Sequence, residues 1–166
     1  AYWNNSNNTA IVEKIIQDYF GRKHAVSLCD IGNNNGLLAI ECLLSSYIKV
    51  KQAVCFSTDK QSLLETKSLV NSFYHEIHDR YIEVNKGELE TLNYLPDYDI
   101  VSLIDCLADK TSKVTMDELV LRAWQSVKAG GILIIKDDQQ IVNQLASVIE
   151  GFGTINYYSS IVASKE

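Results

Sequence analysis

The sequence predicts an α/β fold, a doubly wound and mostly parallel sheet of six to seven strands with helices on both faces. Short apolar runs typical of buried strands alternate with amphipathic stretches of helical period. These strand–helix units recur about every 20 to 35 residues, the spacing of right-handed βαβ crossovers. A glycine-bearing turn within residues 25–37, AVSLCDIGNNNGL, joins the first strand to its helix. Such a turn forms a ligand cradle at the carboxyl end of a parallel sheet.

The composition is that of a globular domain with its own core. The chain has 166 residues, 46% of them hydrophobic, with a single proline, and we expect one domain over residues 1–166. The formal net charge of -6 disfavours RNA as a partner, because a polyanion would be repelled. No apolar run approaches the roughly 20 residues that a membrane helix needs. We therefore expect a cytoplasmic protein with no membrane partner.

Cysteine and histidine spacing does not suggest a metal site. The four cysteines are Cys29, Cys42, Cys55 and Cys106. They form no CxxC pair and no zinc-like set with the histidines, and three of them fall inside apolar runs. We expect buried, reduced thiols of an intracellular protein and no metal.

The first third of the chain predicts two helices around one strand. Residues 1–8 are polar and rich in asparagine, and we expect a loop or a lid. Residues 9–20 carry apolar side chains at helical spacing, and Gly21 stands where that helix ends. The buried strand at residues 25–31 is followed, after the turn, by an apolar helix at residues 37–47.

The middle of the chain predicts three further strands. Residues 52–57 form a short apolar strand, and Asp59 is a plausible cap for the helix that follows. Residues 81–84 and residues 99–104 have the β-branched and apolar character of the third and fourth strands.

The last third of the chain predicts two helices, a further strand between them and a β-prone C-terminal segment. Residues 116–127 are helical with one apolar side, and the pair at 130–131, Gly-Gly, breaks the chain before a strand at residues 132–135. Residues 138–149 form another amphipathic helix. Residues 152–163 are β-prone and close the chain as one strand or a cramped hairpin.

Four motifs follow one another along these elements. They are DIGNNNG at 30–36, STD at 57–59, KGE at 86–88, and the pair YDIV at 98–101 with VKAGGILII at 127–135. In this order they resemble the landmarks of the class I S-adenosylmethionine-dependent methyltransferases, over about residues 9–150. The resemblance implies a Rossmann-like sheet of order 3-2-1-4-5-7-6, with strand seven antiparallel, and S-adenosyl-L-methionine as cofactor.

The resemblance implies that the turn after the first strand holds the methionine part of the cofactor. Gly32 and Gly36 would let the backbone approach the ligand, and Asp30 would bind its amino group through a charge-assisted hydrogen bond. Asn34 stands at the family's middle glycine, and Asn33 replaces a residue that is usually small. Their side chains would lie in or beside the cofactor site, or would bond their own backbone in a surface turn.

Ribose and adenine contacts are implied for the next two strand ends. The family ends its second strand in an acid that accepts hydrogen bonds from both ribose hydroxyls. Here Ser57 has that position and Asp59 follows two residues later, so Ser57 holds the ribose weakly or Asp59 reaches back. Asp59 alternatively only caps its helix. Glu88 would accept from the adenine amino group, or is a solvated loop carboxylate.

Asp105 is the candidate catalytic residue, because it lies just beyond the fourth strand, where acceptor-side residues gather in this family. Some RNA ribose methyltransferases use a Lys-Asp-Lys-Glu set in which a lysine deprotonates the hydroxyl. Lys14, Asp105, Lys136 and Glu166 occur in that order here, an order that chance supplies easily in a chain 22% charged.

The sequence thus predicts methyl transfer from S-adenosylmethionine to a small-molecule acceptor rather than to RNA or protein. A non-catalytic methyltransferase-like domain that binds a partner is the alternative, motivated by the asparagine turn and the missing acid on the second strand. A nicotinamide-dependent oxidoreductase shares this sheet, but its Gly-x-Gly-x-x-Gly fingerprint differs from the Gly-x-x-x-Gly spacing of the turn.

Overall fold

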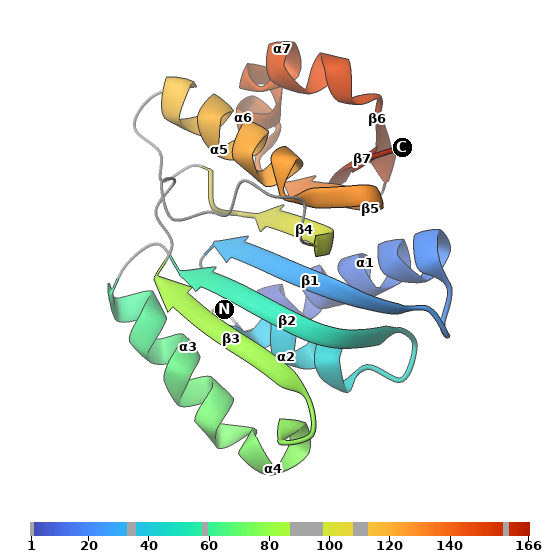
Figure 1. Ribbon diagram of the computed structural model, residues 1–166. Coiled ribbons are helices and arrows are strands. Elements are labelled where there is room, and N and C mark those ends of the chain that lie inside the picture. The colour runs from blue at the N-terminus through green and yellow to red at the C-terminus, as the bar shows by residue number, and fades with distance from the viewer. Residues whose placement is uncertain (1, 33–35, 58–59, 87–97, 108–112, 158–159) are drawn as a thin grey trace.

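A seven-stranded sheet with helices on both faces forms the centre of the structure, which confirms the predicted fold class (Figure 1). The structure is a computed structural model and describes residues 2–32, 36–57, 60–86, 98–107, 113–157 and 160–166. Of these, only the backbone is described at residues 2–7, 57, 86, 113–114 and 157.

The sheet has the strand order β3-β2-β1-β4-β5-β7-β6, as predicted. The strands are β1 (Ala25–Gly32), β2 (Lys49–Ser57), β3 (Tyr81–Lys86), β4 (Tyr98–Ile104), β5 (Val127–Lys136), β6 (Thr154–Tyr157) and β7 (Ser160–Ser164). Strands β1 to β5 run parallel, whereas β7 is antiparallel to both β5 and β6. The β-prone end of the chain is therefore a hairpin.

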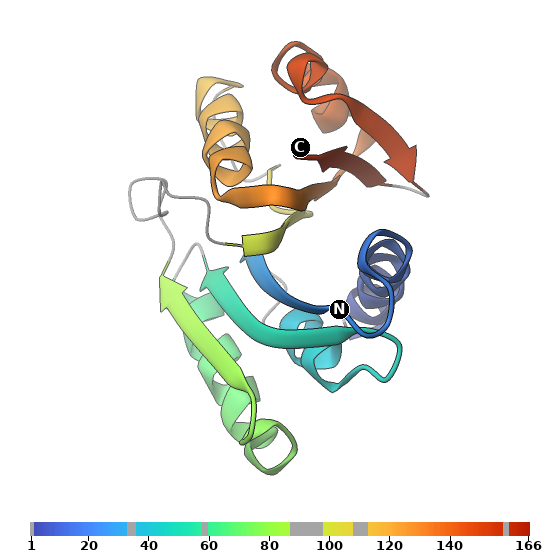
Figure 2. The same cartoon turned by 45° about the vertical axis from the view of Figure 1, so that its right-hand side comes forward.

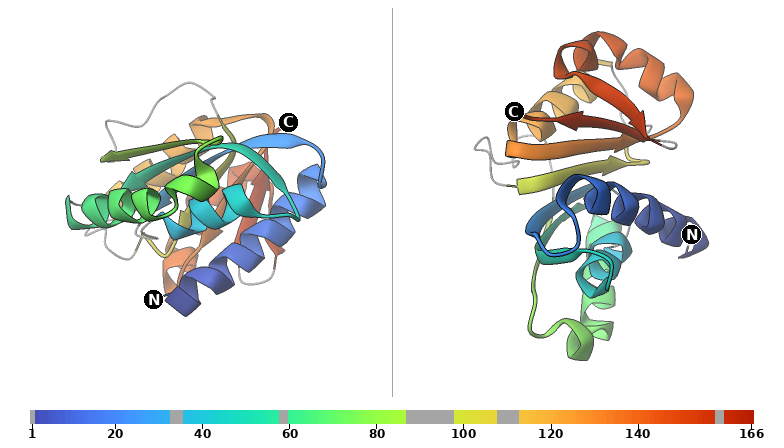
Figure 3. Two further views of the ribbon diagram at one scale, coloured as in Figure 1. Left: turned by 90° about the horizontal axis from the view of Figure 1, so that it is seen from below. Right: turned by 90° about the vertical axis from the view of Figure 1, so that its right-hand side faces the viewer.

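The helices lie in two layers. They are α1 (Tyr2–Phe20), α2 (Leu37–Leu44), α3 (Lys60–Ser72), α4 (Tyr74–Ile77), α5 (Lys113–Gln125), α6 (Gln139–Gln144) and α7 (Ala146–Ile149), with a 3₁₀ turn, η2 (Glu150–Phe152). Helices α1 to α4 cover one face of the sheet and α5 to α7 the other (Figures 2 and 3).

Alternate residues of the central strands supply two cores. On β1, Val26 and Leu28 pack beneath α1 and α2, whereas Cys29 and Ile31 belong to the core beneath α5 and α7. Nearly every residue of β1 is buried, as expected for a strand covered on both faces. Each large aliphatic side chain buried in this way contributes about 1.5–3 kcal/mol to folding.

The loop or lid expected over residues 1–8 is wrong, because α1 begins at Tyr2. Asn8 and Thr9 are almost fully buried, and Thr9 donates a hydrogen bond from Oγ1 to Glu41 Oε1 of α2 at 3.2 Å. Asparagine is a poor helix former, so burial of Asn8 and Thr9, rather than local propensity, stabilises the helix at these positions.

The expected break at Gly130–Gly131 is also wrong, since both glycines lie inside β5. Gly130 N–H donates to Lys165 O at 2.6 Å, and Lys165 N–H donates to Gly131 O at 2.9 Å. A Cβ on Gly131 would lie 2.5 Å from Asp99 O, so glycine here permits a close approach of β4 at an irregularity in the ladder.

Other differences concern element ends. Helix α2, expected over residues 37–47, ends at Leu44. The helix expected over residues 138–149 is divided at Leu145 into α6 and α7. All four cysteines are buried free thiols, as expected. Among the described helices none has the length and apolarity to cross a bilayer.

Candidate functional site

The carboxyl ends of β1 to β5 meet at one edge of the sheet, and those predicted site residues that the structure describes lie at or near this edge. Gly32 at the end of β1 pairs with Ile104 at the end of β4, which in turn pairs with Lys136 at the end of β5. On the other side of β1, Ser57 of β2 pairs with Lys86 of β3. The chain order reverses between β1 and β4, and ligands of open α/β sheets bind at this switch point.

The turn between β1 and α2 requires glycine at both of its ends. Gly36 has φ 77°, and a Cβ there would lie 2.6 Å from Thr66 Cγ2 of α3. Gly32 has φ 140°, and a Cβ there would lie 2.8 Å from Cys106 Cβ. Both positions are therefore restricted to glycine by backbone conformation and by packing against the protein's own side chains.

The start of α2 offers backbone donors to a ligand. Gly36 is its N-cap and provides no side-chain hydrogen bond, so no side-chain cap satisfies the first N–H groups of this helix from within the described residues. The N–H groups and the helix dipole favour an anionic group at this position, for instance the carboxylate of an amino acid. The donor set thus fits the methionine part of S-adenosylmethionine.

Asp30 is a buried carboxylate two residues before the end of β1, 3% exposed. Its Oδ1 accepts a hydrogen bond from Ser102 Oγ of β4 at 2.8 Å. Burial raises the pKa of the Cys55 thiol on β2, and the negative charge of Asp30 raises that pKa further, which places the carboxylate within electrostatic reach of Cys55. Asp30 therefore lies on the α1 and α2 face, below the turn.

Asp105 directly follows β4 and has a strained backbone. Its φ of 52° is the single positive value among the described non-glycine residues, a conformation that costs on the order of 1–3 kcal/mol. Its N–H donates to Lys136 O at 2.8 Å, and its Oδ2 lies 3.7 Å from Lys136 Nζ. The Asp105 side chain is 54% exposed and that of Lys136 22%. The structure thus presents an exposed carboxylate at the ligand-binding edge.

Two further polar residues contact Asp105 or the backbone that follows it. Asn8 of α1, 3% exposed, donates from Nδ2 to Asp105 Oδ2 at 3.4 Å, and Asp137 Oδ2 accepts from Leu107 N–H at 3.0 Å. Neither residue was identified from the sequence. For Asn8 a signal exists, because extending the helical period of residues 9–20 backwards places Asn8 on the same helix face as Val12 and Ile15.

The remaining predicted ligand contacts are only partly visible. Asn33, Asn34, Asp59 and Glu88 lie outside the described residues. Ser57 is the last residue of β2, as predicted, but only its backbone is described. The roles assigned to these residues stay predictions, as does the contact of Asp30 with a cofactor amino group.

The Lys-Asp-Lys-Glu set is not assembled. Asp105 and Lys136 are in contact, but Lys14 forms an ion pair with Asp18 at 3.4 Å within α1. Glu166 follows Lys165, whose backbone pairs with Gly130–Gly131 near the opposite end of β5. The described residues contain no group of His, Cys, Asp or Glu that could hold a metal ion.

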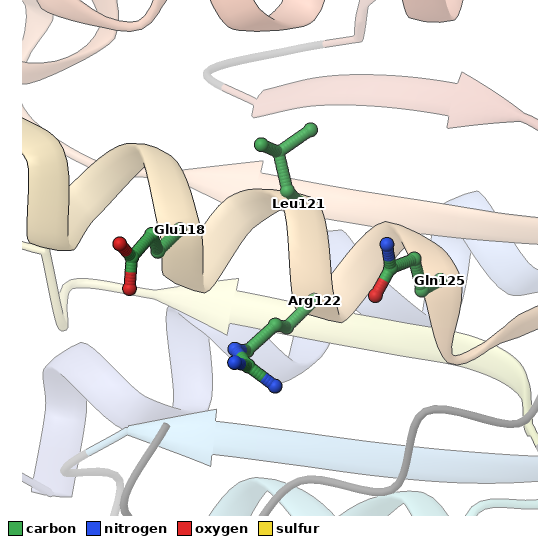
Figure 4. Close-up of a pocket in the computed structure, with 4 residues that line it drawn as sticks. All are labelled: Glu118, Leu121, Arg122 and Gln125. Atoms are coloured by element: carbon green, nitrogen blue, oxygen red, sulfur yellow. The ribbon is translucent and has the colours of Figure 1, made fainter. Parts of the chain in front are cut away.

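A separate cavity of about 310 Å³ lies along one side of α5 (Figure 4). Its lining residues share one helix face and are Glu118, Leu121, Arg122 and Gln125. Of the predicted site residues that the structure describes, none lines this cavity. The site at the carboxyl edge and the cavity on α5 are therefore distinct features.

Comparison with solved structures supports the fold, whereas comparison of sequences identifies no related family or curated protein. No protein-family model matches the chain, and no curated protein matches its sequence. A candidate S-adenosyl-L-methionine-dependent methyltransferase from Methanococcus maripaludis superposes with a TM-score of 0.72 at 16% identity, over 96% of this chain and 86% of that one.

Two larger proteins share the same architecture. CalS10, an amino pentose methyltransferase from Micromonospora echinaspora with S-adenosylmethionine bound, gives a TM-score of 0.61 at 16% identity over 80% of this chain. The [4+2]-cyclase SpnF gives a TM-score of 0.65 at 13% identity over 87% of this chain. The match spans 50% of CalS10 and 57% of SpnF. The chain has the Rossmann-like fold of class I S-adenosylmethionine-dependent methyltransferases.

Proposed function

We propose that the protein transfers a methyl group from S-adenosyl-L-methionine to a small-molecule acceptor. The observation that carries the proposal is the placement of three features at the switch point between β1 and β4. These are the turn bounded by Gly32 and Gly36, the start of α2, which no described side chain caps, and the exposed carboxylate of Asp105. The net charge of -6 supports a small molecule over RNA as acceptor.

When bound, S-adenosylmethionine supplies a methyl group on a positively charged sulfur. The N–H groups at the start of α2 would hold its carboxylate, and Asp30 would hold its ammonium group, directly or through water. The turn and the residues after β4 then align the acceptor and exclude water. An activated acceptor needs no base, so the main contribution of these residues is positioning.

Calorimetric titration tests the cofactor part of the proposal. We expect saturable heat with S-adenosylmethionine and with S-adenosylhomocysteine, at one site per chain. Asp30→Asn removes one negative charge from the site and should weaken binding about tenfold or more. Glu76→Gln, an acid-to-amide change at an exposed position of α4, is the matched control. A folded wild-type protein that gives no heat at high micromolar ligand would contradict the proposal.

A non-catalytic binding module is the second candidate function. It is favoured by the packing of Gly32 on Cys106 and of Gly36 on Thr66, which accounts for both glycines without any ligand. The same titration separates the two candidates. A binding module of this kind gives no heat with either nucleoside, whereas a methyltransferase binds both.

A further inference from the structure

We propose that Asn8 and Lys136 position Asp105 so that its second carboxylate oxygen accepts a hydrogen bond from the methyl acceptor. The acceptor is then an N–H or O–H compound, an amine or a hydroxyl, and not a sulfide or a carbon nucleophile. This inference rests on the proposed methyl transfer and names its substrate class. The inference depends on the backbone after β4, on the two side-chain contacts to Asp105 Oδ2, and on the hydrogen-bonding chemistry of the other carboxylate oxygen, Oδ1.

The backbone after β4 is fixed to the end of β5 by two hydrogen bonds. Asp105 N–H donates to Lys136 O at 2.8 Å, and Leu107 N–H donates to Asp137 Oδ2 at 3.0 Å. Between them Cys106 packs against Gly32 of the cofactor turn. This fixed segment maintains the φ of 52° at Asp105, which an unrestrained aspartate would seldom adopt. The direction of the carboxylate is therefore imposed by the fold.

Both side-chain contacts of Asp105 use the same oxygen. Lys136 Nζ lies 3.7 Å from Oδ2, and Asn8 Nδ2 donates to Oδ2 at 3.4 Å. Asn8 is buried, and Lys136 is mostly so, hence neither donor is free to follow a moving carboxylate. No hydrogen bond or ion pair from the described residues reaches Oδ1. Within the described part of the chain the carboxylate is thus held through Oδ2 alone, and the side chain is 54% exposed at the ligand edge.

Helix α1 is itself held in place, so Asn8 is a fixed donor. Thr9 bonds to Glu41 of α2, and one turn later Glu13 Oε2 accepts from Ser45 Oγ at 3.1 Å. These contacts set α1 alongside α2 in the same direction, so that the helix begins on the side of the carboxyl edge (Figure 3). Asn8 therefore approaches Asp105 from the face that also carries Asp30 and the start of α2.

The chemistry of Oδ1 limits its partner. An ionised carboxylate oxygen accepts hydrogen bonds and cannot donate them. Amines and hydroxyls provide the donor, whereas thioethers and carbon nucleophiles do not. A hydrogen bond to a charged group contributes about 1.5–3 kcal/mol, or about 10- to 100-fold in affinity. A fixed carboxylate therefore selects for the donor-bearing class of acceptor.

The test uses three probes with equal numbers of non-hydrogen atoms, namely propylamine, 1-propanol and ethyl methyl sulfide. Each is titrated into the full chain saturated with S-adenosylhomocysteine, and the side-chain amide resonances of Asn8 are followed by NMR. These resonances are assigned by their loss in Asn8→Ser. We expect saturable shifts with propylamine and 1-propanol and none with the sulfide. Equal shifts with the sulfide, or no shift with any probe, would overturn the proposal.

Variants separate a positioning role from a structural one. Asp105→Asn keeps the size of the side chain, and asparagine tolerates positive φ, so the fold should persist while binding weakens about tenfold or more. Lys136→Met should weaken binding less, and Lys136→Arg should restore it. Lys128→Met is the control. Unaltered probe affinity in Asp105→Asn, or failure of Lys136→Arg to recover what Lys136→Met loses, contradicts the proposal.

The outcome also separates this inference from the proposed function. Absence of S-adenosylhomocysteine binding by the wild-type protein would overturn both. Binding of S-adenosylhomocysteine without any preference for donor-bearing probes would overturn the present inference and leave the proposed methyl transfer standing.

Discussion

Ser102 of β4 donates a hydrogen bond of 2.8 Å to Asp30 of β1, and both side chains are buried between the sheet and helices α1 and α2. The two residues face each other directly in the parallel register of β1 and β4. This contact therefore joins the two strands whose carboxyl ends form the switch point. It also satisfies one oxygen of a carboxylate that is otherwise costly to bury.

Ser102→Ala should destabilise the protein by about 1–3 kcal/mol, because the buried Asp30 carboxylate loses a donor that water cannot easily replace. The free energy of unfolding from urea titration measures the effect. Ser72→Ala removes an exposed hydroxyl that bonds within its own helix, and should change stability by less than about 0.5 kcal/mol. Equal effects of the two substitutions would argue against a special contribution from the β1–β4 contact.

Gly36→Ala should be destabilising through both backbone strain and contact. The φ of 77° costs alanine about 1–2 kcal/mol, and the added Cβ would lie 2.6 Å from Thr66 Cγ2. Thr66→Ser removes that methyl group, so the double variant should recover part of the loss in thermal unfolding. Gly151→Ala is the control, since Gly151 has no positive φ and no atom within 4 Å of a Cβ. A purely additive double variant would contradict the predicted contact.

Glu13→Gln should stabilise the protein near neutral pH. Burial raises the pKa of Glu13 above its ordinary value, and the hydrogen bond from Ser45 offsets this only in part. The folded state therefore binds the proton more tightly than the unfolded state. The contribution of Glu13 to the free energy of unfolding is therefore greatest below the unfolded-state pKa of about 4.3. This contribution is lost as the pH rises through the higher pKa of Glu13 in the folded state.

The glutamine keeps an acceptor for Ser45 and removes the charge, so the gain at pH 7 should be a fraction of a kcal/mol and should shrink below about pH 4. Urea titrations at both pH values measure it. Removing this charge should also lower the pKa of Glu41, which Glu13 helps to raise. Glu76→Gln, at an exposed position, is the matched control. A gain that persists undiminished at pH 4 would refute the assignment.

The thiols should be unreactive in the folded protein. All four are buried, and burial raises the pKa of both Cys42 and Cys55, so neither access nor the thiolate form favours reaction. Ellman's reagent at pH 8 should label less than about one thiol per chain in native buffer and all four in guanidinium chloride. Rapid labelling of the native protein would show that the core opens more easily than its packing implies.

The strands and most helices were predictable because both signals are local. Buried strands such as β1 and β4 are continuous apolar runs, and the apolar face of α5 repeats with helical period. The strand order was implied by the resemblance and is confirmed. The errors lie where tertiary contacts prevail over local propensity. Residues before Thr9 are helical and end in the buried Asn8, and hydrogen bonds to Lys165 hold Gly130–Gly131 within β5.

The candidate site was predictable only in its chain-local part. Asp30, Gly32 and Gly36 form one short segment, and Asp105 follows a recognisable strand. Which side chains from elsewhere meet them depends on the three-dimensional arrangement. Sequence spacing does not reveal that Asn8 approaches Asp105 across 97 residues or that Thr66 restricts position 36 to glycine.

The direction of α1 has a practical consequence for handling the protein. A purification tag fused ahead of residue 1 would emerge beside the ligand-binding edge, because α1 starts there and runs away from it (Figure 3). A tag placed after Glu166 would emerge at the far edge, where Lys165 pairs with Gly130–Gly131. Calorimetry and crystal soaking are therefore best carried out with C-terminally tagged material.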